Sequence, residues 1–107
     1  MTVNQLAGCG FKTIALPDGD REINGVYIGD LLSWVMGRAQ ADNAWITIMS
    51  NINILAVASL ADTACIILAE GVEVAQDVID TANAKGVNIL SSSEPAYEIA
   101  CTLKEKL

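Results

Sequence analysis

Short runs of β-branched and aliphatic residues alternate with longer amphipathic segments in the second half of the chain. Three of these runs are predicted to be buried strands because each is brief, apolar and bounded by polar residues or glycine: residues 45–49, 64–68 and 87–90. A segment with the spacing of a helix follows each run. Short apolar strands that alternate with helices favour parallel pairing, so this half predicts an α/β fold with a largely parallel sheet.

The predicted helices of this half differ in how much of their surface is apolar. Residues 54–60 are apolar nearly all round, which indicates a helix that is covered on more than one side. Residues 74–82 place apolar side chains opposite acidic ones, and Gly86 is suited to end that helix. The last helix is expected to begin with a capping box between Ser91 and Glu94.

The first half is predicted to add a short helix and further strands. Thr2 can cap a helix over residues 3–7, and residues 11–16 have the pattern of a strand that ends at a turn rich in proline, glycine and aspartate. Residues 22–28 are predicted to be a second strand or an extended arm, and Asp30 is expected to cap the helix that follows. A hairpin or edge strands in this half would make the sheet mixed.

Length and composition fit one domain with its own core. The chain has 107 residues, of which 52% are hydrophobic and 18% charged, and it is therefore too apolar for a disordered segment. No apolar run reaches the ~20 residues of a membrane helix, and no signal-peptide pattern is present. We expect a single compact α/β domain over residues 1–107, with a central, mostly parallel (mixed) sheet flanked by helices, in a cytoplasmic protein without membrane contact.

The charge balance argues against nucleic acid and anionic membranes as partners. The net charge is −7, and the bases are scattered singly along the chain: Lys12, Arg21, Arg38, Lys85, Lys104 and Lys106. Binding to a phosphate backbone needs several Lys or Arg side chains on one surface, because they displace its counterions. This chain offers no such cluster.

The residues that most often carry catalysis or bind metals are scarce. The chain has no histidine, which excludes Ser-His-Asp and Cys-His arrangements within it. Cys9, Cys65 and Cys101 lie far apart among small or apolar residues, so we expect three buried thiols, with Cys9 the most accessible. Neither a dinucleotide fingerprint nor a P-loop is present, and we expect no catalytic residue, metal site or cofactor.

Polar side chains gather where two of the predicted strands end. In an α/β sheet, ligands bind beyond the carboxyl ends of the parallel strands, near helix amino termini. The candidate ligand-binding residues at these ends are Ser50, Asn51, Asn53, Ser91, Ser92 and Ser93. Their hydroxyl and amide groups suit one small polar or anionic ligand, such as a phosphate or nucleotide, held between the two turns. The alternative is that they only cap the helices that follow.

Two further positions are singled out by their chemistry. Arg21 could bind a phosphate or carboxylate with both arms of its guanidinium, or it could form a structural ion pair with a nearby acid. Trp34, Val35 and Met36 are consecutive bulky residues that cannot all point into one core. Together with the apolar helix, they predict a homodimer with Trp34 or Val35 at or near the contact.

Three segments of the chain carry a family resemblance. Residues 20–33 (DREINGVYIGDLLS), 44–71 and 86–100 resemble the DRTGG domain, which occurs alone and within larger proteins such as phosphotransacetylases and CBS-domain pyrophosphatases. The family is related in fold to the N-terminal domain of HPr kinase/phosphorylase. The resemblance therefore implies a compact α/β domain with a largely parallel sheet, and it corresponds to an accessory domain without a catalytic P-loop.

These observations lead to two functional hypotheses. The first is a non-enzymatic regulatory or interaction module that forms a homodimer and senses a small polar or anionic ligand. The second is a small accessory enzyme or phosphotransfer subunit that acts with a partner protein on a phosphorylated metabolite, through residues 91–93 and Arg21.

Overall fold

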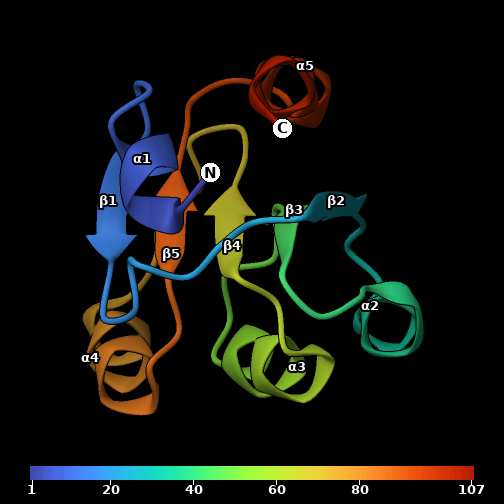
Figure 1. Cartoon of the computed structure of the whole chain (residues 1–107). Coiled ribbons are helices and arrows are strands. Elements are labelled where there is room, and N and C mark those ends of the chain that lie inside the picture. Colours follow the sequence, from blue (N-terminus) through green and yellow to red (C-terminus); the bar gives the residue numbers. More distant parts are fainter.

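Five strands form one sheet with helices packed on both of its faces, as Figure 1 shows for the computed structural model of residues 1–107. The strands are β1 (Lys12–Ala15), β2 (Gly25–Ile28), β3 (Asn43–Thr47), β4 (Cys65–Leu68) and β5 (Ile89–Ser91). The helices are α1 (Val3–Ala7), α2 (Leu32–Arg38), α3 (Asn53–Ala61), α4 (Gln76–Lys85) and α5 (Ala96–Lys106). No helix combines the length and the apolar character needed to cross a bilayer.

The order of the strands is β1-β5-β4-β3-β2. Strands β2, β3, β4 and β5 are parallel to their neighbours, and β1 pairs antiparallel with β5. The predicted mixed, mostly parallel sheet is therefore confirmed. The alternative of a hairpin in the first half is wrong, because β1 and β2 lie at opposite edges of the sheet.

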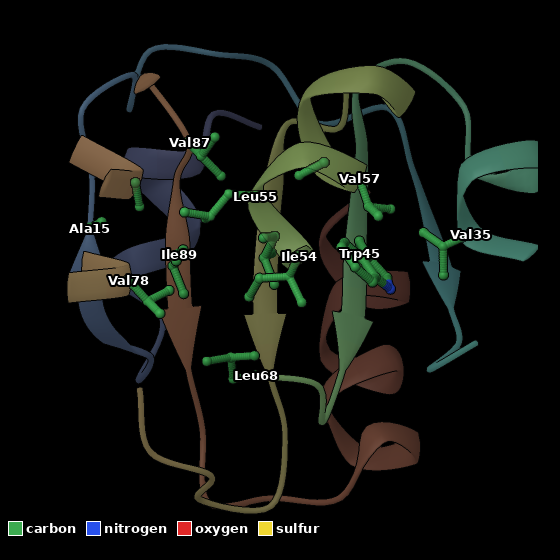
Figure 2. Close-up of a cluster of buried hydrophobic side chains, with 13 residues drawn as sticks. Ala15, Val35, Trp45, Ile54, Leu55, Val57, Leu68, Val78, Val87 and Ile89 are labelled. Atoms are coloured by element: carbon green, nitrogen blue, oxygen red, sulfur yellow. The ribbon is translucent and has the colours of Figure 1, made fainter. Parts of the chain in front are cut away.

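The sheet separates two hydrophobic cores. Helices α2, α3 and α4 cover one face, where Trp45 and Ile66 of the sheet pack with Leu55 and Val78 of the helices (Figure 2). Helices α1 and α5 cover the other face, which includes Ile46. Trp45 and its neighbour Ile46 thus lie in different cores. Burial on both faces explains why the central strand β4 is apolar at every position rather than at alternate ones.

The structure confirms some predicted helix ends and corrects another. Thr2 caps α1 in a reciprocal capping box with Gln5, and Gly86 ends α4 in the left-handed conformation. The prediction that Asp30 caps α2 is wrong, because that helix begins after Leu31 without a side-chain cap. Asp30 Oδ1 instead accepts hydrogen bonds from the hydroxyl of Thr47 at 2.7 Å and from the N–H of Ile48 at 3.0 Å, and so joins the ends of β2 and β3.

The predicted capping box of the last helix is also wrong. Ser91 is the final residue of β5, and α5 begins later, at Ala96, directly after Pro95. It is the hydroxyl of Ser92 that accepts a hydrogen bond, from the N–H of Glu94 at 3.0 Å. Since a residue before proline is driven out of the helical conformation, the helix cannot start at Glu94.

Candidate functional site

A cleft of about 520 Å³ opens beside the carboxyl end of β5. Its floor is the edge of the sheet, where Lys12 of β1 lies opposite Ser91 of β5 in antiparallel register, and where Ile14 lies two residues further along β1. Its wall is formed by residues 71–74, which lead into α4, and by Ile79 of that helix. Neighbouring strands and the connection after β4 thus enclose one concave site.

The turn that follows β5 is tied to the connection that follows β4. The N–H of Ser92 donates to the carbonyl of Leu68, and the N–H of Gly71 donates to the carbonyl of Ser92, both at 2.9 Å. The hydroxyls of Ser91 and Ser93 make no hydrogen bond within the chain, although both residues line the cleft. These two hydroxyls, one at the end of β5 and one in the turn after it, are therefore free to bind a ligand at a place where the backbone is already fixed.

The other predicted polar turn lies elsewhere. Asn51 Oδ1 accepts a hydrogen bond from the N–H of Asn53 at 2.9 Å, at the start of α3, which is the capping role considered as the alternative. Ser50 precedes this turn, and none of the three residues lines the cleft beside β5. Because β4 lies between β3 and β5, the structure keeps the two groups of candidate residues apart rather than bringing them together around one ligand.

Arg21 lies at the opposite end of the sheet from the cleft. Its guanidinium donates to Asp42, just before β3, at 3.0 and 3.1 Å, and to the carboxylate of Asp62, at the end of α3, at 2.7 Å. Partial burial acts to lower the pKa of Arg21, but the hydrogen bonds to Asp62 and Asp42 outweigh it and raise the pKa. This arrangement is the ion-pair alternative, and it leaves Arg21 far from the serines of β5.

The three consecutive bulky residues of α2 point in different directions, as the sequence predicts. Val35 is fully buried in the core beneath α2, so it has no surface for a contact with another chain. Trp34 is 52% exposed, and Met36 is also exposed. The guanidinium of Arg38 lies 3.7 Å from the centre of the Trp34 ring, a cation–π contact one helical turn away.

Comparison with known proteins agrees with this fold. The sequence profile of the DRTGG domain matches residues 17–105. The chain belongs to the DRTGG domain family. This confirms the resemblance drawn from the three segments of the sequence. No curated protein sequence matches the chain significantly.

The fold of this DRTGG domain is also found in a solved structure. It contains the CBS and DRTGG domains of the regulatory region of Clostridium perfringens pyrophosphatase, complexed with the activator diadenosine tetraphosphate. The two structures agree with a TM-score of 0.66 at 11% sequence identity. The match covers 89% of this chain and 42% of the pyrophosphatase chain, so this chain spans less than half of that structure.

The cysteines of the DRTGG domain differ in exposure. Cys65 is buried in β4, and burial raises the pKa of its thiol to about 12, so the thiol is protonated at neutral pH. The prediction of three buried thiols is wrong for Cys9, which is partly buried, and for Cys101, which is exposed. Cys101 rather than Cys9 is the most accessible, because α5 turns Ile99 and Leu103 toward the core instead. No group of three or more potential metal ligands lies close together.

Sequence reasoning missed two charged residues of the cleft, Lys12 and Glu73. Lys12 begins the first predicted strand, and Glu73 lies in the connection before α4. The two come together only because β1 pairs with β5 at the edge of the sheet, beside the connection from β4. Gly10 and Gly71, both at positive φ at the rim of the cleft, are the nearest signal in the sequence, since they mark sharp turns there.

Proposed function

We propose that this DRTGG domain is a non-enzymatic regulatory module that binds a small polar ligand in the cleft beside β5 and pairs with a second copy of itself. The observation that carries the proposal is the cleft itself, which is lined by two serines with free hydroxyls, Ser91 at the end of β5 and Ser93 in the turn that follows, where backbone hydrogen bonds fix the chain. The regulatory region of the pyrophosphatase, whose structure includes a domain of this fold, was solved with an activator, which supports a regulatory role.

The position of the cleft suits a regulatory module whose surface becomes more stable when the ligand binds. A ligand that contacts both the turn after β5 and residues 71–74 would hold the chain segment that leads into α4. β1 is an edge strand that pairs only with β5. A bound ligand would add further bonds between this edge of the sheet and the rest of the domain. Binding would thereby stabilise this edge, and a partner protein that contacts α4 or β1 would sense the change.

A thermal-shift screen tests this proposal. A ligand at 100 times its dissociation constant should stabilise the protein by about 2.7 kcal/mol. The panel should contain inorganic phosphate, nucleotides, sugar phosphates and amino acids. We expect at least one compound to raise the melting temperature, and the double replacement Ser91→Ala and Ser93→Ala to abolish the shift without unfolding the protein.

A serine outside the cleft provides the matched control. Ser33 is an exposed residue of α2, so Ser33→Ala should leave the ligand-induced shift unchanged. A shift that survives the loss of Ser91 and Ser93 would mean that these hydroxyls do not hold the ligand, and the proposed site would be wrong.

The alternative of an accessory enzyme or phosphotransfer subunit requires Arg21 near residues 91–93. Arg21 is instead held by Asp42 and Asp62 at the other end of the sheet. No observation favours the alternative over the regulatory module.

A further inference from the structure

We propose that the cleft beside β5 selects a small zwitterion of the α-amino-acid class with an apolar side chain. This inference rests on the proposed function, because it takes the cleft to be the ligand site. It goes beyond that function in naming the charges and the shape that the ligand must have.

The charges that line the cleft are balanced and unpaired. Lys12 lies on the β1 side and Glu73 on the side of the connection to α4. Neither forms an ion pair within the chain, since the ion pairs of the structure join the amino terminus to Glu22 and Arg21 to two aspartates. The cleft therefore presents one free positive and one free negative group to whatever enters it.

This balance argues against a phosphate or nucleotide as the ligand. A doubly charged phosphate would meet a single lysine, and it would be repelled by Glu73 in the same cleft. A chain of net charge −7 adds no long-range attraction for an anion. A zwitterion can place its carboxylate toward Lys12 and its ammonium toward Glu73, so both side chains gain a partner.

The remaining lining suits the rest of such a molecule. The hydroxyls of Ser91 and Ser93 can each donate to a carboxylate or accept from an ammonium group. The apolar part of the lining consists of four partly buried side chains: Ile14, Val72, Val74 and Ile79. They offer a surface against which an aliphatic side chain can be removed from water. A volume of about 520 Å³ is in the range of small-molecule sites.

Three related compounds test the inference directly. L-Leucine carries both charges, isopentylamine lacks the carboxylate, and 4-methylpentanoate lacks the amine, while all three share the aliphatic group. Isothermal titration of the full chain should show binding of L-leucine, with each analogue weaker by about tenfold or more, because each leaves one charged side chain of the cleft unpaired.

Two single replacements assign each charge of the ligand to its partner. Lys12→Gln should remove the advantage of L-leucine over isopentylamine, and Glu73→Gln should remove its advantage over 4-methylpentanoate. Lys85→Gln and Glu98→Gln change charges on α4 and α5 outside the cleft, and they should leave all three affinities unchanged. Circular dichroism confirms that each variant is folded.

The outcomes separate this inference from the proposed function. Suppose that inorganic phosphate or AMP binds, that L-leucine does not, and that Ser93→Ala weakens the binding. The cleft is then a site for another class of ligand, and the inference that it selects a zwitterion is overturned. If L-leucine binds but neither Lys12→Gln nor Glu73→Gln alters the preference among the three compounds, the inference is also overturned. If none of these probes binds at millimolar concentration, the inference fails, and the wider thermal-shift panel decides the proposed function separately.

Discussion

Two buried threonines differ chiefly in whether the hydroxyl has a partner. Thr47 is 2% exposed, and its hydroxyl donates to Asp30 while accepting from the N–H of Met49 at 3.1 Å. Thr63 is 7% exposed, and its hydroxyl has no hydrogen-bond partner. A buried polar group without a partner costs stability, whereas a hydrogen bond to a carboxylate contributes to it. The same side chain therefore has opposite effects at the two positions.

Replacement of each threonine by valine tests this difference. Thr47→Val should lower the free energy of unfolding by about 1–3 kcal/mol, since it removes a hydrogen bond to a charged group. Thr63→Val keeps the shape and removes the unpartnered hydroxyl, so it should leave stability unchanged or raise it by roughly 1 kcal/mol. Urea unfolding followed by tryptophan fluorescence measures both. If both variants lowered the free energy of unfolding by the same amount, the two hydroxyls would not differ in their contribution to stability.

At the scale of elements, Arg21 joins the extended arm before β2 to the amino ends of β3 and β4. Its partners Asp42 and Asp62 both have positive φ, at 67° and 59°, a conformation that is unfavourable for a residue with a side chain. The hydrogen bonds to Arg21 offset this cost. Arg21, Asp42 and Asp62 thus form a clamp that fixes where β3 and β4 begin.

Arg21→Lys keeps the charge but loses the planar fork that reaches two carboxylates at once. We expect it to lower the free energy of unfolding by about 1–2 kcal/mol, a value reduced from that of a buried pair because Asp62 is mostly exposed. Arg38→Lys on α2 is the matched control and should have a smaller effect. If Arg21→Lys left stability unchanged but abolished ligand binding, Arg21 would be a ligand residue rather than a clamp.

The helices and strands can be predicted from local sequence patterns, whereas the pairing of the strands in the sheet cannot. Every predicted strand and helix is found, with ends displaced by at most four residues, because periodicity and glycine or proline punctuation are local properties. The position of β1 beside β5 depends on how all the elements pack, and no spacing within residues 11–28 indicates it. For the same reason, the cleft could not be predicted from the sequence. Its serines could be predicted, whereas Lys12 and Glu73 meet only through that strand pairing.

At the scale of the molecule, exposed apolar side chains concentrate at one edge. Six of the nine large exposed hydrophobic residues lie in β2, in α2 and the residue before it, and at the ends of the segment between β3 and α3: Ile28, Leu31, Trp34, Met36, Ile48 and Ile52. β2 is an edge strand, and an open groove of about 530 Å³ runs between it and α5. Unprotected edge strands with apolar surface are sites where another chain can pair.

We expect this edge to form the contact of a homodimer, with Trp34 at or near its centre. Sedimentation velocity at micromolar concentration should give the mass of two chains. Trp34→Glu should weaken association by about thirtyfold or more, since a tryptophan at an interface contributes about 2 kcal/mol or more. The new glutamate can pair with Arg38 one turn along, so the helix tolerates it. Ala84→Glu places the same charge on exposed α4, which packs beside β1 at the opposite edge of the sheet, and should leave the dimer intact. A wild-type monomer at high concentration, or a dimer that tolerates Trp34→Glu, would rule out pairing through this edge.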